Sequence, residues 1–510
     1  MDERARIPVS LPRDGPTQSY WQDPPDAIAD LRTTSELPNS ADVVIIGSGI
    51  TGAAVAWNLL QADDTQNKKR TIVMLEARQA CSGATGRNGG HTKAASYRSF
   101  LDHASTLGTP AAVKIASLEL ANIQAVQAFA REHSIPCDLS PCDTIDVIYD
   151  EAQWLQAHEA VAAMRAAFPQ GDPVAEYTFY SREETEKKFY CHDNYLNGKP
   201  ETLYGGVVYF AGSLSAYKFG VGVLKLCLAQ GLNLQTHTPA LGLTKHQEGT
   251  WKVDTPRGTI ITKQVVLATN GYTAALVPSK FQGVIVPLRG QITAHRPGAA
   301  MPPVLPTTYS FIYDKGYEYM VPRPAGSTFA GDIVMGGGLV RAPEDGLDEY
   351  GTTDDTSINE TISNYLRETT PRYFGRDWGD DSPEGRVRKE WTGIMGYSPD
   401  GFPLVGEVPG EKGLWASVSF QGHGMVLCWM CARALVEMME GRDDDEALGD
   451  WFPEVFRVSE ERLGKRFVGR LHTAAAAAAA AAAPIGGIMG ESEAETMVDS
   501  EETGRGVGGG

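Results

Sequence analysis

The feature that most constrains this chain is a glycine-rich turn between a predicted strand and a predicted helix. The β-branched residues 43–46 lead into Gly47-Ser48-Gly49-Ile50-Thr51-Gly52, and helix-forming residues continue to Leu60. In a Gly-x-Gly-x-x-Gly turn the first glycine allows a tight turn, the second lets the backbone approach a pyrophosphate, and the third lets the helix pack closely. The N-terminus of the helix then faces the phosphate charge. The pattern predicts a βαβ unit that binds a dinucleotide.

A second predicted strand, residues 71–75, supports this interpretation. It ends on Glu76, 24 residues after Gly52. A carboxylate at about this distance binds the 2′-hydroxyl of an adenosine ribose. Glu76 therefore argues against a 2′-phosphate, and so against NADP. The unit alone does not decide between FAD and NAD.

The α/β pattern returns farther along the chain. The other predicted helices are 104–132, 151–167, 218–230 and 425–440, and the other predicted strands are 233–236, 251–253, 259–261 and 265–268. Because these pieces alternate with a proline- and glycine-broken region, we expect an α/β fold whose nucleotide-binding domain is split. A Rossmann-like domain is expected from residues 39–100, 201–281 and 386–445. A substrate domain with a mixed α+β sheet is expected from residues 101–200 and 282–385.

The two ends of the chain differ from these regions in composition. Residues 1–38 are rich in Pro, Asp and Ser and predict an extended lead-in that packs weakly. Residues 446–470 form a C-terminal extension. Residues 471–510 hold ten consecutive alanines and then an acidic, glycine-ending sequence. Such a low-complexity tail buries little apolar surface, so we expect it to be disordered.

Charge and cysteine usage exclude several classes of protein. The 45 Lys and Arg against 64 Asp and Glu give a formal net charge of −19. An acidic chain is a poor electrostatic partner for nucleic acid or anionic membranes, so we expect neither. The 7 cysteines are odd in number and irregularly spaced, and no apolar signal core follows the first charged residues. We expect a cytoplasmic protein without a metal site.

Three further segments resemble the D-amino-acid oxidase (DAO) superfamily of FAD enzymes. Residues 77–91, ARQACSGATGRNGGH, are similar to the second flavin-contacting loop of that superfamily. Residues 265–271, VVLATNG, are similar to its middle nucleotide-fold strand, and residues 391–425 to its C-terminal flavin-closing segment. The segments occur in the family's order. The GATGRNGGH form most resembles the γ-glutamylputrescine oxidoreductase-like amine oxidases.

The resemblance implies non-covalently bound FAD and a small-molecule amine or amino-acid-like substrate. It implies oxidation of the C–H bond next to an amine nitrogen by hydride transfer to flavin N5, with hydrolysis of the imine. Reoxidation by molecular oxygen would give hydrogen peroxide. The residues expected to contact FAD are Gly47, Gly49, Ile50, Thr51, Gly52, Glu76, Ala77, Arg78, Gly83, Ala84, Thr85, Gly86, Arg87, Asn88, Gly89, Gly90, His91, Ala240, Thr269, Asn270, Gly271, Gly393, Gly422, His423, Gly424 and Met425.

Some positions depart from the family pattern. Gly393 stands where sarcosine-oxidase-like members carry a flavin-linking cysteine, which excludes a cysteine link there. Val426 replaces a lysine that binds the substrate carboxylate in those relatives, which argues against a small N-methyl amino acid. The spacing of His91 does not match the histidine anchor of dimethylglycine-dehydrogenase-like relatives, so a polar role near the isoalloxazine is favoured. The family also has a lysine that activates oxygen, and no motif in this sequence identifies an equivalent lysine.

No catalytic residue is identified by the sequence, but Tyr317, Tyr319, Arg289 and His423 are candidates. Tyr317 and Tyr319 share one face of a predicted strand near Tyr313, where packing in the sheet is the alternative role. Arg289 is suited to bind a carboxylate bidentately, or to hold a turn or a flavin-side carbonyl. His423 lies between two glycines before a predicted helix, whose N-terminus would stabilise the reduced flavin. The alternative is an ordinary glycine-rich loop.

Other functions are left open. Cys428-x-x-Cys431 has the spacing of a redox pair, but it lies in an apolar stretch that predicts a core helix. A dehydrogenase of the same fold that passes electrons elsewhere, and a flavin-holding protein that acts in interaction or trafficking, are the alternatives to an oxidase. A nicotinamide dehydrogenase is disfavoured by the GATGRNGGH loop and the split domain. The substrate and the oligomeric state are not predicted.

Overall fold

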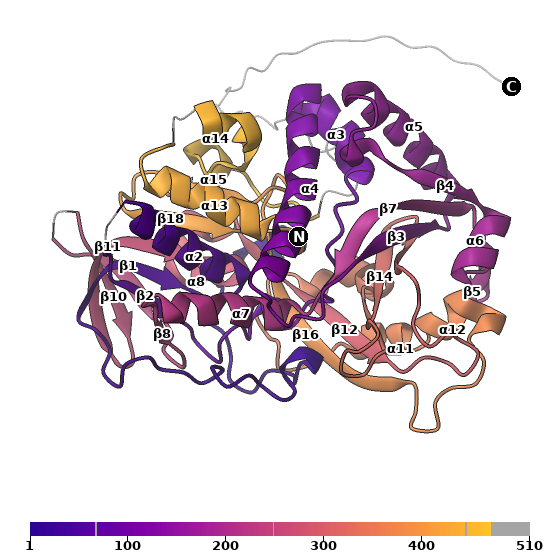
Figure 1. The fold of residues 1–510 in the computed structure, drawn as a ribbon, viewed down its shortest axis with the longest axis horizontal. Helices are drawn as coiled ribbons and strands as arrows, with labels where there is room; N and C mark the ends of the chain where they lie inside the picture. The colour runs from indigo at the N-terminus through magenta and orange to yellow at the C-terminus, as the bar shows by residue number, and fades with distance from the viewer. Residues whose placement is uncertain (67–68, 248, 444–445, 471–510) are drawn as a thin grey trace, which may run out of the picture. The chain divides into compact units, whose positions relative to one another are not determined.

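Two 8-stranded sheets organise residues 1–66, 69–247, 249–443 and 446–470, the ranges that the computed structural model describes (Figure 1). In the first sheet, β1 pairs in parallel with β11 and β2, and β18 and β8 extend the parallel set on either side. β10 and β9 continue from β11 as an antiparallel meander. Its strands are β17 (Leu404–Glu407), β18 (Leu414–Val418), β11 (Gly258–Leu267), β1 (Ser40–Ile46), β2 (Ile72–Leu75), β8 (Asn233–Gln235), β10 (Trp251–Thr255) and β9 (Gly242–Lys245).

Helices cover one face of this sheet. Val43 and Ile45 belong to the same core cluster as apolar residues of α2 (Ile50–Thr65), α7 (Ala216–Ala229) and α13 (Cys428–Met439). Val44 and Ile46 point to the opposite core cluster, together with residues of the meander. This alternation buries β1 on both faces, as in doubly covered parallel sheets. The expected α/β fold with a Rossmann-like βαβ unit is confirmed.

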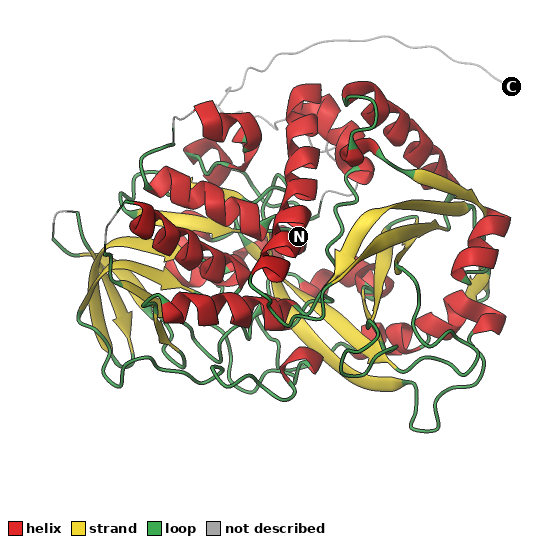
Figure 2. Ribbon diagram, viewed as in Figure 1, coloured by secondary structure: helices red, strands yellow, loops and turns green. Residues whose placement is uncertain are grey.

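The second sheet is mixed and has helices on both faces (Figure 2). β3 pairs in parallel with β13, whereas the other neighbours are antiparallel. One face packs against α3 (Tyr97–Leu107), α4 (Thr109–Glu132) and α5 (Glu151–Ala167), and the other against α11 (Glu360–Arg367) and α12 (Thr369–Phe374). Its strands are β16 (Val387–Tyr397), β12 (Val286–His295), β15 (Ile333–Gly336), β14 (Gly316–Pro322), β13 (Thr308–Tyr313), β3 (Ser140–Ile148), β7 (Gly205–Ser213) and β4 (Thr178–Ser181).

The remaining elements are short. They are α1 (Asp2–Arg6), α6 (Arg182–Phe189), β5 (Asn194–Leu196), β6 (Lys199–Glu201), α8 (Thr273–Leu276), α9 (Pro278–Phe281), α10 (Pro343–Gly346), α14 (Glu446–Trp451) and α15 (Glu460–Leu463), with 3₁₀ turns that include η1 (Tyr20–Gln22), η2 (Ala84–Gly86), η4 (Asn270–Tyr272) and η8 (Gly424–Val426). Within the described ranges, every helix is too short or too polar to cross a lipid bilayer.

Some elements differ from the sequence prediction. The helix expected over 104–132 is two helices, because Gly108 has a φ of +86° and breaks the chain direction between α3 and α4. The helix expected from residue 425 begins only at Cys428, after η8. β7 and β16 lie in the second sheet, although residues 201–281 and 386–445 were expected in the nucleotide-binding domain. The domain division itself stays a prediction.

The N-terminal segment, residues 1–38, does not pack weakly, and that expectation is wrong. Tyr20, Trp21 and Gln22 are buried, and the Tyr20 ring stacks on Trp391 of β16. The prediction is based on the Pro, Asp and Ser content of the segment. Buried aromatic side chains stabilise its packing against the rest of the protein, although it contains little helix or strand. The predicted disorder of residues 471–510 concerns residues outside those described.

Candidate functional site

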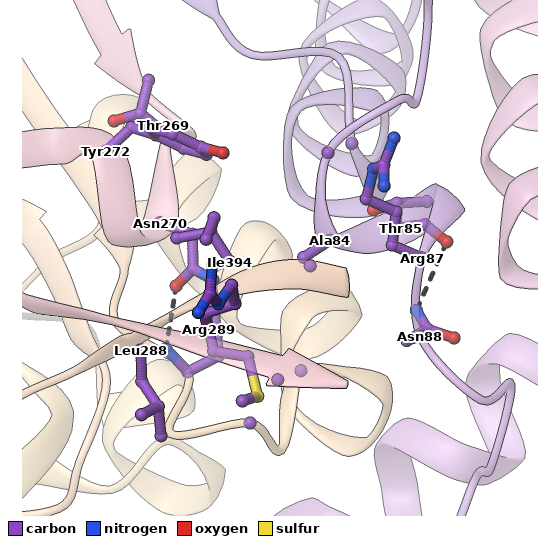
Figure 3. A pocket seen from close by; sticks show the side chains of 18 of the residues that line it. Ala84, Thr85, Arg87, Asn88, Thr269, Asn270, Tyr272, Leu288, Arg289 and Ile394 are labelled. Carbon is purple, nitrogen blue, oxygen red and sulfur yellow. Dashed lines mark hydrogen bonds between the residues drawn. The ribbon is translucent and has the colours of Figure 1, made fainter. Parts of the chain in front are cut away.

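A cavity lies where the carboxyl ends of β1 and β2 face strands β12, β14 and β16 of the second sheet. Ligands of open α/β sheets bind in the crevice at this end of the strands. Figure 3 shows Ala84, Thr85 and Arg87 on one side of the cavity, and Tyr272 and Ile394 on the other. The cavity thus reaches from the glycine-rich turn to the second sheet.

The glycine-rich turn is built as its sequence predicts. Gly47 has a φ of +105°, and a Cβ at this position would lie 2.5 Å from the carbonyl oxygen of Ala268. A Cβ on Gly52 would lie 2.0 Å from the Gly47 oxygen, and one on Gly49 would lie 2.8 Å from Thr85 Oγ1. Glycine is therefore required at all three positions. The first backbone N–H groups of α2, which have no partner inside the helix, lie at the cavity.

Glu76 is fixed at the end of β2. Its carboxylate accepts hydrogen bonds from the backbone and the hydroxyl of Ser48, at 3.2 and 2.6 Å, and from the backbone N–H of Arg78 at 3.0 Å. These bonds hold the carboxylate at the cavity wall, where it could accept one more hydrogen bond from a ribose hydroxyl.

The loop that contains η2 is held between the two sheets. Thr85 Oγ1 accepts a hydrogen bond from the Ile50 N–H at 3.0 Å, which ties the loop to the start of α2. Arg87 donates to the carbonyl oxygens of Ser82 at 2.9 Å and Thr392 at 2.8 Å. Burial lowers the pKa of Arg87 to about 10, although the nearby Asp355 carboxylate raises it. Arg87 therefore remains protonated at neutral pH and places positive charge at the cavity.

A buried ion pair joins the nucleotide-binding corner to the region between the sheets. Arg78 donates to both carboxylate oxygens of Asp355, at 3.0 and 2.9 Å, and both side chains are buried. The bidentate geometry is the strong form of this contact. Asp355 thus positions the loop that follows Glu76.

Part of the N-terminal segment braces the same loops. Trp21 Nε1 donates to the Asn88 carbonyl oxygen at 2.5 Å, and Ser19 Oγ donates to the Gly86 carbonyl oxygen at 2.5 Å. Leu11 and Pro12 of this segment line the cavity. The N-terminal segment, which lies outside the βαβ unit, therefore completes the wall of the cavity.

Tyrosines from several strands form the wall away from the glycine-rich turn. Tyr313 lies at the end of β13, Tyr317 and Tyr319 lie on β14, and Tyr397 lies at the end of β16. A Cβ on Gly89 would lie 2.2 Å from the Tyr319 ring, so this ring packs tightly against the GATGRNGGH loop. This wall is apolar with hydroxyl groups at its edge.

The guanidinium of Arg289 is engaged by the protein itself. It donates to the two oxygens of Glu349 at 2.6 and 3.1 Å and to Ser357 Oγ at 2.9 Å. Arg289 lines the cavity, but this geometry supports the role of holding a turn. A bidentate contact to a substrate carboxylate would need the donors that Glu349 already uses.

His423 and His91 lie behind the cavity wall. His423 Nε2 is 3.0 Å from the Ala94 carbonyl oxygen and 3.3 Å from Glu119 Oε1. His91 Nε2 is 2.8 Å from Thr308 Oγ1, and burial keeps the pKa of His91 well below its usual value.

The predicted site residues divide into two groups. Those that line the cavity are Gly47, Gly49, Ile50, Thr51, Glu76, Ala77, Arg78, Gly83, Ala84, Thr85, Arg87, Asn88, Ala240, Thr269, Asn270, Gly393, Gly422, Gly424, Met425, Arg289, Tyr317 and Tyr319. Those that support it without lining it are Gly52, Gly86, Gly89, Gly90, His91, Gly271 and His423.

Several lining residues escaped the sequence prediction. They include Leu11, Pro12, Tyr272, Gln291 and Arg470. Tyr272 follows the predicted VVLATNG strand directly, so its proximity could have been inferred. Gln291 lies two residues after the candidate Arg289 on β12, so its proximity could also have been inferred. Leu11, Pro12 and Arg470 carried no motif, because only the tertiary fold brings them to the cavity.

Three buried polar atoms of residues that line the cavity have no protein partner among the described residues. They are Arg78 Nε, Tyr272 Oη and Gln291 Nε2. Buried polar groups are normally hydrogen-bonded, so a polar ligand in the cavity would satisfy them. Together with the glycine turn and Glu76, they fit a dinucleotide cofactor.

The cysteine pair does not form a reactive site. Cys428 and Cys431 are buried, and burial raises the pKa of Cys428 to about 12. A thiol with so high a pKa is a poor nucleophile at neutral pH. The described ranges contain no cluster of His, Cys, Asp and Glu suited to a metal ion.

Comparisons with known proteins agree with this geometry. The family model "DAO: FAD dependent oxidoreductase" matches residues 42–438. The chain is 25% identical over 406 residues to a probable oxidoreductase OrdL of Rhizobium meliloti (strain 1021), covering 79% of this chain and 84% of the relative. It is 21% identical over 431 residues to the γ-glutamylputrescine oxidoreductase of Escherichia coli (strain K12), covering 83% and 89%.

The fold is also that of a solved relative. The crystal structure of glycine oxidase from Geobacillus kaustophilus has a TM-score of 0.63 and 18% identity, and the match covers 83% of this chain and 99% of that chain. The family match spans both sheets and the cavity between them, and the cavity fits a dinucleotide. This chain belongs to the DAO family of FAD-dependent oxidoreductases.

Proposed function

We propose that this protein is an FAD-dependent oxidase that acts on an amine or an amino-acid-like substrate. One observation carries the proposal: a single cavity is lined by the dinucleotide turn with Glu76 and also by Tyr317 and Tyr319. A cofactor at the turn and a substrate at the tyrosines would share one enclosed space. The glycine oxidase and the γ-glutamylputrescine oxidoreductase, by their names, support an amine-type substrate.

When bound, FAD would supply the redox chemistry, which is oxidation of the C–H bond next to the substrate nitrogen with transfer of the electrons to oxygen. The chain supplies binding and orientation. The glycine turn and the first N–H groups of α2 would bind the pyrophosphate, and Glu76 the ribose. Arg87 would add positive charge, and the tyrosine wall would exclude water from the substrate.

The proposed attachment is non-covalent. His91 does not line the cavity, and its Nε2 contacts Thr308. Gly393 lines the cavity and offers no side chain for a link. Acid precipitation of the purified protein should therefore leave the yellow flavin in the supernatant; colour that stays with the pellet would contradict the proposal.

A dehydrogenase that uses another electron acceptor is the second candidate. Among the described residues that line the cavity there is no lysine. The resemblance to the family implies an oxygen-activating lysine, so a wall without one supports the second candidate. Both candidate enzymes oxidise the substrate in the same way. They differ in the electron acceptor that reoxidises the flavin.

The test uses the FAD-loaded full chain in two stages. Amines and amino acids are first added without oxygen, and the flavin absorbance near ~450 nm is followed, because reduction bleaches this band. Oxygen is then admitted, and hydrogen peroxide is measured. Bleaching followed by stoichiometric peroxide supports the oxidase. Bleaching without rapid reoxidation supports the dehydrogenase, and no bleaching by any compound contradicts both.

A further inference from the structure

Arg470 of the C-terminal extension reaches the cavity. It lines the cavity together with Tyr397, Tyr317 and Tyr313. It lies 470 − 438 = 32 residues beyond the end of the region matched by the family model. This part of the wall is therefore supplied by a segment outside the region that the family model matches.

Arg470 differs from the other three arginines that line the cavity. Arg78 is paired with Asp355 at 2.9 Å, and Arg87 lies 3.7 Å from the same carboxylate. Arg289 is paired with Glu349 at 2.6 Å. Arg470 has no ion pair and no hydrogen bond to any described residue. Each of these three arginines thus has a carboxylate within 4 Å, with Arg78 and Arg87 sharing that of Asp355, whereas Arg470 has none among the described residues.

The groups around Arg470 are neutral hydroxyls. Its guanidinium carbon lies 5.6 Å from the centroid of the Tyr397 ring, and the phenol groups of Tyr317, Tyr350 and Tyr313 are its other electrostatic neighbours. The Tyr313 hydroxyl donates to buried Glu318 at 2.5 Å. Tyrosine hydroxyls can orient a guanidinium, but they do not neutralise its charge.

A second unpaired cation lies nearby. The guanidinium carbon of Arg98, on α3, is 4.9 Å from the centroid of the Tyr317 ring. No described carboxylate forms an ion pair with Arg98. Arg98 does not line the cavity, but its charge adds to the positive potential at the tyrosine wall. This local sign is opposite to the net charge of −19.

We propose that Arg470 is a specificity-determining residue that binds a carboxylate of the substrate. The proposal rests on the proposed function and narrows its substrate class to amines that carry a carboxylate. A partly buried guanidinium without a counter-ion gains most from a bidentate carboxylate, and it repels a second ammonium group. An amino acid or a carboxylated amine conjugate is therefore favoured over an unmodified diamine.

The first test measures binding without turnover. Acetate, benzoate and 4-phenylbutyrate, with the matching neutral amides, are titrated into FAD-loaded wild type, Arg470→Ala, Arg470→Lys and Arg466→Ala, and the visible flavin spectrum is followed. Arg466 is the control, since it is exposed and pairs with Asp2 outside the cavity. We expect at least one carboxylate to bind the wild type and to bind Arg470→Ala at least about tenfold more weakly, as for a lost charged hydrogen bond.

The variants separate charge from folding. Arg470→Lys should recover part of the affinity, and Arg466→Ala should retain all of it. The amides should bind all four proteins alike. Carboxylates that fail to bind the wild type, or that bind wild type and Arg470→Ala equally, overturn the proposal. A matching loss of amide binding in Arg470→Ala also overturns it, because a collapsed cavity and not a lost charge would explain the change.

The second test uses any compound that bleaches the flavin. For a substrate with a carboxylate, Arg470→Ala should raise KM at least about tenfold and change kcat much less. The reason is that the contact to the carboxylate stabilises the bound substrate and the transition state equally. For the same amine without the carboxylate, KM should not change. If carboxylate binding depends on Arg470 but no amine bleaches the flavin, the proposed function fails and the anion site stands. If amines bleach the flavin but Arg470 has no effect, the function stands and this inference fails.

Discussion

The two ends of the cavity are built in opposite ways. The nucleotide end is built mainly on one stretch of chain, from Gly47 to Asn88, and its shape depends on backbone geometry and missing side chains. Leu11, Pro12, Ala240 and Thr269 complete it. The tyrosine end combines side chains of β13, β14, β16 and the C-terminal extension, which are far apart in the sequence. Cofactor binding is therefore centred on a local motif, whereas the wall proposed for the substrate is assembled from distant parts of the chain.

The largest expected effect is at the nucleotide end. In Gly52→Val the new Cβ would lie 2.0 Å from the Gly47 carbonyl oxygen, so the turn and the start of α2 must separate. Such overpacking costs about 1–3 kcal/mol or more. We expect the purified variant to lose its bound FAD, measured as flavin absorbance per protein.

The control for this variant is Gly242→Ala on β9. A Cβ there meets no atom within 4 Å, and the backbone needs no positive φ. It should keep wild-type flavin content. Full flavin content in Gly52→Val would mean that the turn does not bind the cofactor.

The next effect concerns the contact between the two regions. Asp355→Ala leaves buried Arg78 without its bidentate partner and removes the carboxylate beside Arg87. Breaking a buried pair from one side costs about 3–5 kcal/mol. We expect the free energy of unfolding, from urea titration of the apoprotein, to fall by about this amount, with weaker FAD retention.

The matched control is Glu437→Ala, which breaks the helix-surface pair with Arg433 at 3.0 Å. A surface pair contributes about 0–1 kcal/mol, so this variant should be near wild type. Equal losses in the two variants would show that Asp355 has no special part in joining the ends.

The same contrast explains what the sequence could predict. The roles of Gly47, Gly52 and Glu76 follow from local geometry, and α5 has the bounds that helical periodicity indicates. The break at Gly108 was missed because apolar periodicity continues across it. Arg470 and Trp21 could not be inferred, since their contacts are set by packing of segments that lie 67 or more residues apart in the chain.

A smaller effect is expected from the N-terminal brace. Trp21→Phe keeps an aromatic ring but removes the hydrogen bond from Nε1 to the Asn88 carbonyl oxygen. A fully buried acceptor left unsatisfied costs about 1–3 kcal/mol, and the Asn88 bond is partly buried, so the low end of this range is expected. We expect faster dissociation of FAD by several-fold, measured by the recovery of flavin fluorescence on dilution. Trp154→Phe on α5 is the control. If FAD dissociated equally fast from this variant, the hydrogen bond of Trp21 would not be what supports the nucleotide loop.

The smallest effect is expected at the tyrosine end. Tyr317→Phe keeps the ring beneath Arg98 but removes a hydroxyl that faces Arg470. We expect this hydroxyl to form one hydrogen bond to the bound substrate, which contributes about 0.5–1.5 kcal/mol, so kcat/KM for a carboxylate-bearing substrate should fall by about two- to tenfold. Flavin content should not change, because the nucleotide end is untouched. Tyr195→Phe, at an exposed position on β5, should leave both quantities unchanged. If Tyr317→Phe lost FAD as Gly52→Val is expected to, the two ends would not be separable, and substrate recognition could not be assigned to the tyrosine wall alone.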